Sequence, residues 1–110
     1  MGARYIQEGK NVDYTPSSAV TAGDVIVQGS LVGVAKLDIA ANRQGALAVE
    51  GVFDFPKATG AGSGIAVGIT VYWDATAHQA TATATNNTLL GKTVKAAADA
   101  DASVRVRMSQ

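Results

Sequence analysis

Gly91-Lys92-Thr93 has the residue types that end a phosphate-binding loop, in which glycine backbone N–H groups and a lysine hold the phosphates. That loop also needs a glycine five positions before Gly91, and the residue there is Asn86. The residues on both sides of the tripeptide alternate in polarity as a strand does. We therefore interpret the tripeptide as part of a strand, and an enzyme or nucleotide-binding protein built on Lys92 is the least favoured hypothesis.

The remaining polar residues do not form a catalytic or metal-binding set. His78 is the single histidine and the chain has no cysteine, so the usual ligands of zinc are missing. Asp74 could orient His78 in a serine hydrolase, but no serine lies in a G-x-S-x-G turn. Asp99 and Asp101 supply too few oxygens for calcium, which takes about six to eight. The sequence favours a protein that is not an enzyme and has no catalytic residues, metal or cofactor.

Tyr72 and Trp73 are adjacent aromatic residues of the kind that stack against sugars. Successive residues of a strand point to opposite faces of the sheet, so only one of the two can be buried. We expect Trp73 to lie in the core and Tyr72 at a contact between subunits. A carbohydrate-binding or other adhesion module that uses Tyr72 and Trp73 is the alternative function.

Residues 46–57 are the predicted centre of the sheet that positions these side chains. Read with a period of two, this segment places apolar residues on one face, which is typical of a strand with one buried side. Two further strands, at 69–74 and 103–108, are expected to pack against that face. Together they form the predicted core: Leu47, Val49, Phe53, Phe55, Ile69, Val71, Trp73, Val104 and Val106.

Glu50 and Asp54 fall on the opposite face of the same predicted strand. We interpret them as solvated or intersubunit charges, because residues four apart on a strand are too distant to share a proton. The strand is expected to end at Pro56, which has no backbone N–H. Residues 58–68 are rich in glycine and are predicted to form a long, mobile loop.

Short strands separated by glycine or Asn/Asp turns are predicted along the rest of the chain, and no segment keeps a helical period. Residues 25–28 and 31–37 are expected to form a hairpin, and the alternation of alanine and threonine at 79–85 predicts another strand. Further strands are predicted at 4–7, 12–14 and 88–95. The fold class is all-β, a small barrel or sandwich of about eight short strands with at most one or two short helical turns.

Charge and composition exclude several classes of partner. Nine basic and nine acidic residues cancel, and the alternating Arg105 and Arg107 are too few for the positive stripe that binds nucleic acid. No apolar run approaches the roughly 20 residues of a membrane span, and the N-terminus lacks a signal peptide. Hydrophobic residues make up 47% of the chain but aromatic residues only 5%. Such a core buries little area per side chain, so we expect association with other copies to add stability.

Several segments taken in order resemble one family. These are Y-I-Q-E-G near the N-terminus, T-A-G-D-V-I-V-Q-G-S, G-V-F-D-F-P-K, V-Y-W-D, N-N-T-L-L-G-K-T and the final V-R-V-R. They are similar to the capsid cement (head decoration) proteins of tailed bacteriophages and prophages, and the resemblance covers residues 5–108. The segments G-V-F-D-F-P-K and V-Y-W-D are the specific part of this resemblance.

The resemblance implies a structural protein of the virion, made in the bacterial cytoplasm and added to the outer surface of an assembled head. It implies a homotrimer whose other partner is the major capsid protein. It also implies an N-terminal arm that lies on the capsid subunit and adds a strand to its sheet. The expected division is an extended arm at 1–10 and a single β domain at 11–110. The capsid-binding residues of the arm would be Arg4, Tyr5, Ile6, Gln7 and Glu8.

Overall fold

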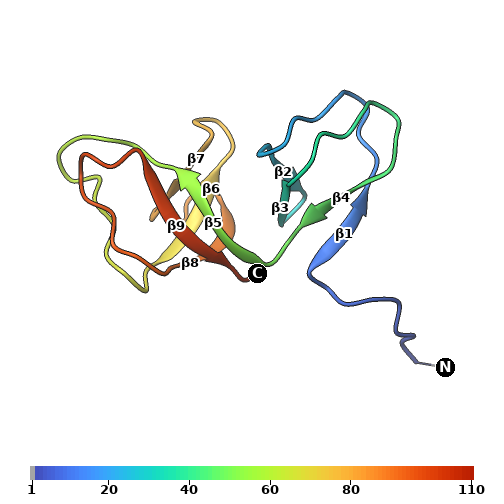
Figure 1. Ribbon diagram of the computed structural model, residues 1–110. Helices are drawn as coiled ribbons and strands as arrows, with labels where there is room; N and C mark the ends of the chain where they lie inside the picture. Colours follow the sequence, from blue (N-terminus) through green and yellow to red (C-terminus); the bar gives the residue numbers. More distant parts are fainter. Residues whose placement is uncertain (1) are drawn as a thin grey trace.

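The structure, a computed structural model, describes residues 2–110 and contains two antiparallel sheets and no helix in that range (Figure 1). The nine strands are β1 (Asn11–Tyr14), β2 (Val25–Gln28), β3 (Leu31–Ala35), β4 (Gly45–Ala48), β5 (Gly51–Pro56), β6 (Thr70–Asp74), β7 (Gln79–Thr81), β8 (Thr88–Thr93) and β9 (Ser103–Met108). The predicted all-β fold is therefore confirmed. Each sheet forms one lobe of an elongated molecule that measures 49 × 34 × 23 Å.

The four-stranded sheet has the order β1-β4-β3-β2. Strands β2 and β3 form the predicted hairpin: Gln28 is paired with Leu31, and the two-residue turn between them has Gly29 at φ 63°. A positive φ at that position suits a tight hairpin turn, and glycine adopts it without steric cost. Both faces of strand β3 are buried, because it lies between the two core clusters of the molecule.

The five-stranded sheet has the order β5-β9-β8-β6-β7. Its outer strands approach each other at one end, where Lys57 makes a parallel bridge with Ala80, so the sheet curls toward a barrel. Strand β9 has the predicted bounds and the predicted alternation, with buried apolar residues and the exposed Arg105 and Arg107.

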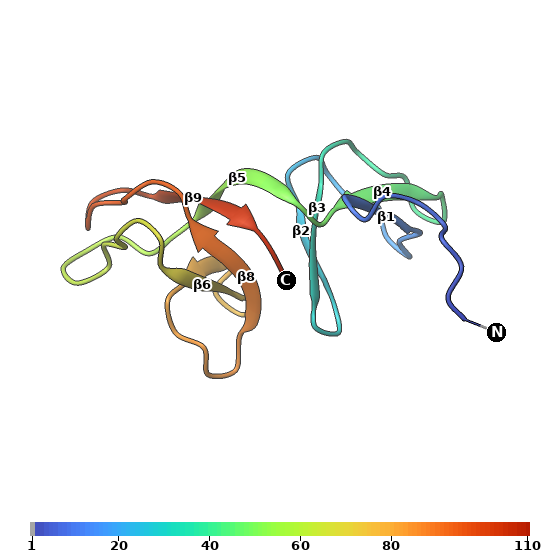
Figure 2. The same cartoon turned by 90° about the horizontal axis from the view of Figure 1, so that it is seen from below.

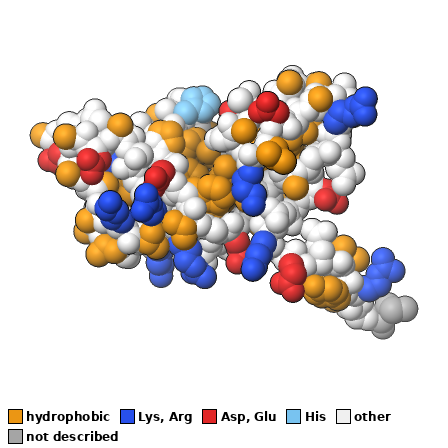
Figure 3. Space-filling view, in the orientation of Figure 1, with side chains coloured by type: hydrophobic (Ala, Val, Ile, Leu, Met, Phe, Trp, Pro, Cys, Tyr) orange, Lys and Arg blue, Asp and Glu red, His pale blue; other side chains and the backbone are white. Residues whose placement is uncertain are grey.

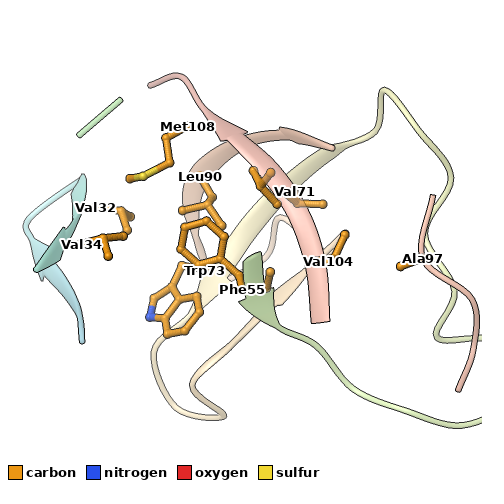
Figure 4. Packing of buried hydrophobic residues seen from close by; sticks show 11 residues of the cluster. Val32, Val34, Phe55, Val71, Trp73, Leu90, Ala97, Val104 and Met108 are labelled. Carbon is orange, nitrogen blue, oxygen red and sulfur yellow. The ribbon is translucent and has the colours of Figure 1, made fainter. Parts of the chain in front are cut away.

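The main core lies between the five-stranded sheet and β3 (Figure 4). Val32 and Val34 of β3 point toward the sheet, where the ring of Phe55 packs against Trp73 with 6.0 Å between ring centroids. Phe53 is only partly buried at the border of this cluster, 6.2 Å from Phe55. The other buried members are Val71, Ala80, Leu90, Ala97, Val104, Val106 and Met108.

A second, smaller cluster covers the other face of the four-stranded sheet and contains Val20, Ala35, Ile39 and Leu47. The loop residues Val20 and Ile39 bridge each other and close it from outside. Gly33 lies beneath Leu47, and a Cβ atom at position 33 would come within 2.8 Å of the Leu47 Cβ. Close packing of this cluster therefore requires a glycine there.

Residues 46–57 do not form one strand, so that prediction is wrong. Strand β4 ends at Ala48, the chain crosses between the lobes, and β5 begins at Gly51 in the other sheet (Figure 2). Gly51 has φ +124°, a backbone conformation that interrupts a regular strand. Leu47 and Phe55 are consequently buried in different clusters, and Glu50 does not share a strand with Asp54.

Three other local predictions are also wrong. Ile69 is 39% exposed, because it precedes β6 and follows Gly68, whose φ of +79° breaks the strand alternation. The segment 79–85 is a strand only as far as Thr81, whose Oγ1 accepts a hydrogen bond from the Thr83 N–H and starts a turn. Residues 4–7 have no strand partner within residues 2–110 and form no strand.

The glycine-rich segment 58–68 forms the predicted loop, but it is held at several points by the loop that precedes β9. Ile65 and Ala97 exchange two backbone hydrogen bonds of 2.9 and 2.8 Å. The Asp99 carboxylate accepts a 2.7 Å bond from the Gly64 N–H, and the Asp99 carbonyl accepts one from Gly60. The two loops therefore form one hydrogen-bonded unit at the end of the lobe.

Candidate interaction surfaces

Gly91-Lys92-Thr93 lies inside β8, where its backbone groups belong to the sheet. The Thr93 hydroxyl is buried and fully used: it accepts from the Ile69 N–H at 3.0 Å and donates to the Ala66 carbonyl at 2.7 Å. Gly91 is buried against β9, and a Cβ atom at position 91 would overlap the Arg107 carbonyl oxygen. The glycine serves strand packing, and the tripeptide does not form a phosphate-binding loop.

The carboxylates considered for catalysis and calcium binding cap turns instead. Asp74 Oδ1 accepts hydrogen bonds from the N–H groups of Thr76 and Ala77 at 3.0 and 3.1 Å. Asp101 Oδ2 accepts from the Ala98 N–H at 2.8 Å. His78 is exposed in the turn after β6, with φ 56°. No group of three or more possible metal ligands occurs within residues 2–110.

The two adjacent aromatic residues point to opposite faces of the five-stranded sheet. Trp73 is 4% exposed and belongs to the core, whereas Tyr72 is half-buried on the outer face, opposite Leu89. The two rings therefore do not form a shared platform for a sugar. The role of Tyr72, Glu50 and Asp54 as contacts between subunits stays a prediction.

Asp54 and Arg105 form a bidentate ion pair on that same outer face. Arg105 Nε lies 2.9 Å from Oδ1 and Nη2 lies 3.2 Å from Oδ2 of Asp54, as their opposed positions on β5 and β9 allow. The hydrogen bond from Arg105 lowers the pKa of Asp54 below its ordinary value, and the positive charges of Arg105 and Lys95 lower it further. The carboxylate is thus held ionised by an arginine of the neighbouring strand.

Residues 2–10 precede the first strand and leave two large apolar side chains in solvent, with Tyr5 76% and Ile6 69% exposed. Gln7 Nε2 donates a 2.9 Å hydrogen bond to the Asn11 carbonyl at the start of β1. Tyr5 Oη donates a longer bond of 3.4 Å to Glu8. The segment projects from the four-stranded lobe (Figure 1).

Lys57 is a structural residue that the sequence did not reveal. It is 5% exposed, and its Nζ donates to the carbonyl oxygens of Ala58 at 2.7 Å and Asp101 at 2.8 Å. These bonds join the end of β5 to the loop before β9. The sequence shows no sign of this role, because lysine is rarely buried without a partner and a lysine directly after a proline is expected to be a solvated loop residue.

The sequence model of the phage cement protein family matches residues 6–108, which include all nine strands. The chain belongs to the phage cement protein family. Searches of the curated proteins and of the solved structures found no match. Membership gives this cement protein a structural role associated with the phage capsid and a place in the virion, and the resemblance seen in the sequence is confirmed. Within residues 2–110 there is no helix of the length and apolarity that a membrane span requires.

Proposed function

We propose that this cement protein binds the outer surface of an assembled phage head as a homotrimer and stabilises it through contacts with the major capsid protein. The observation that supports this most directly is the family match over residues 6–108, because it covers both lobes together with part of the arm. The protein would be made in the bacterial cytoplasm and act as a non-enzymatic clamp between capsid subunits.

The surface of the single chain supports association. It exposes 6828 Å², whereas a folded monomer of this mass exposes about 5,700 Å². Its radius of gyration is 14.9 Å, against about 13 Å for a compact domain of similar length. The excess of roughly 1,100 Å² is surface that neighbouring copies and the capsid would bury. Burial of such surface would add the stability that a core of small side chains lacks.

The arm supports attachment to the capsid. Arg4, Tyr5, Ile6, Gln7 and Glu8 would lie on the major capsid protein and add a strand to its sheet. Two exposed apolar side chains within five residues would then leave water, which favours binding in proportion to the area buried. The arm carries none of the buried residues of either core cluster, so its removal would leave the fold intact.

The experiment compares the full chain with a variant that lacks residues 1–9, using sedimentation for mass and co-pelleting with expanded heads for attachment. We expect both proteins to be folded and trimeric, each with three times the mass of its own chain, which is 11.1 kDa for the full chain. The shortened protein should bind heads more weakly. Leu37→Ala serves as a control, because Leu37 is 78% exposed in the loop after β3. A strictly monomeric full chain that does not bind heads would contradict the proposal. Unfolding of the shortened protein would contradict the claim that residues 1–9 form an arm outside the folded core.

A further inference from the structure

Two basic residues oppose each other on the outer face of the five-stranded sheet. Lys92 of β8 is the register partner of Arg107 of β9. Val52 of β5 lies opposite Arg107 on the other side, and Thr70 of β6 lies opposite Lys92. Directly opposed residues of antiparallel strands point to the same face, so these four side chains form one row across the sheet.

This pairing is unfavourable in the isolated chain. Like charges directly opposite each other on neighbouring strands destabilise a sheet. The single ion pair within residues 2–110 joins Arg105 to Asp54, so neither Lys92 nor Arg107 has a carboxylate partner in that part of the chain. A carboxylate placed between Lys92 and Arg107 would turn this repulsion into two attractions.

Two exposed apolar side chains lie near the two cations. Val52 is 54% and Leu89 40% exposed, both large fractions for hydrophobic residues. Leu89, Lys92 and Arg107 also line a hollow of about 340 Å³ together with Gly91. Figure 3 shows basic and hydrophobic side chains together on the lower side of this lobe, and the arm leaves the other lobe toward the same side. Arginine among exposed apolar groups is typical of protein interfaces.

We propose that this basic face, defined as Val52, Leu89, Lys92 and Arg107, is the surface that docks on a carboxylate-bearing patch of the capsid shell. The proposal rests on the proposed function and deepens it by naming the shell-facing side and the chemistry of its partner. A second copy of the same face is disfavoured as the occupant, because it would bring four cations together without a counter-charge. Two cations are also too few for stable binding of nucleic acid.

Lys92→Glu in the full chain tests this docking, because it separates binding from stability. In the isolated protein the substitution replaces a like-charged pair with a complementary one, so we expect the melting temperature to stay equal or rise. On the shell it places a carboxylate against carboxylates, so we expect affinity for expanded heads to fall by about tenfold or more. The affinity of the unmodified protein should also fall between about 0.05 and 0.5 M salt.

Lys36→Glu is the matched control, since Lys36 is an exposed lysine of the other lobe, and it should bind heads like the unmodified protein. Unchanged head binding by Lys92→Glu, beside normal binding by the unmodified chain, would overturn the docking face and leave the proposed function standing. A changed mass of the free variant would overturn it in favour of contacts between copies, which would involve Tyr72 and Asp54 as the sequence predicts. If the unmodified protein shifted DNA in a gel and Lys92→Glu did not, the docking face would be overturned in favour of a nucleic-acid site. Failure of the unmodified chain to bind heads would overturn both proposals.

Discussion

The carboxamide of Gln110 pairs with the backbone of Val32 as a neighbouring strand would. Its Nε2 donates to the Val32 carbonyl and its Oε1 accepts from the Val32 N–H, both at 2.7 Å. Strand β4 pairs with Val34 and Ala35 of β3 but does not extend to Val32. Gln110 follows β9 of the other sheet, so this side chain completes the hydrogen bonding of β3 and ties the two lobes together.

Gln110→Ala should lower the free energy of unfolding by about 1–3 kcal/mol, because it leaves a partly buried backbone donor and acceptor without partners. Urea denaturation measures this difference. Gln110→Glu keeps the acceptor but loses the donor, so it should also destabilise. Gln28→Ala is the control at an exposed glutamine, with a change within about 0.5 kcal/mol. Equal stability of Gln110→Ala and the unmodified protein would contradict the tie between lobes.

Gly91→Ala should destabilise the fold by at least about 2 kcal/mol, because the added Cβ overlaps the carbonyl oxygen of Arg107 and forces β8 from β9. Lys92→Ala, one residue away and exposed, should change stability by no more than about 0.5 kcal/mol. Thermal denaturation of the two variants side by side checks this contrast. A stable, fully folded Gly91→Ala protein would show that the two strands are not packed as described.

The ion pair of Asp54 with Arg105 predicts a specific acid sensitivity. Because folding lowers the pKa of Asp54, the pair stabilises the protein above the pKa of the unfolded state, and this stabilisation is lost as the pH falls through the lowered value. The unmodified protein should therefore exceed Asp54→Asn in stability at pH 7, and the difference should shrink below about pH 4. Urea denaturation of both proteins at several pH values between these limits measures the difference. The other carboxylates titrate in both proteins, so their contribution cancels in the comparison. A difference that is constant or grows at low pH would contradict the pairing.

Lys57→Met should loosen the unit formed by the loop 58–68 and the loop before β9. Methionine keeps an apolar stem but removes both donors, so the carbonyl oxygens of Ala58 and Asp101 lose their partners, at a cost of about 1–3 kcal/mol. Hydrogen exchange should show faster exchange at the amides of Gly60 and Ile65, which both bond across this unit. Lys95→Met, at an exposed lysine, is the control. Unchanged exchange in Lys57→Met would show that the lysine does not hold the loops.

The sequence was enough to predict the buried residues of a strand that keeps a period of two and stays within one sheet. The alternation of β9 predicted which residues are buried, and Gly29-Ser30 predicted the hairpin of β2 and β3. Consecutive strand positions predicted that Trp73 and Tyr72 point to opposite faces, and Trp73 is the buried one, as expected. These are local properties, and local backbone geometry determines them.

The predictions that were wrong concern points where the chain leaves a strand or changes sheet, and the alternation of apolar and polar residues does not predict such points. Leu47 and Phe55 have the same parity, yet Gly51 redirects the chain into a second sheet, so they are buried in separate clusters. The interaction surfaces show the same limit. The opposition of Lys92 and Arg107 depends on the register of β8 against β9, and residues 15 positions apart in the chain reveal no register by themselves.

The central claim is that the protein cements an assembled head, and heat stability of expanded heads that lack it tests this most directly. Light scattering or calorimetry would follow the disruption of these heads as purified protein is added. We predict that the disruption temperature rises and then levels off at a fixed ratio of cement protein to capsid protein, as expected when a ligand binds the intact state. Heads that break at the same temperature, with or without saturating protein, would contradict the claim.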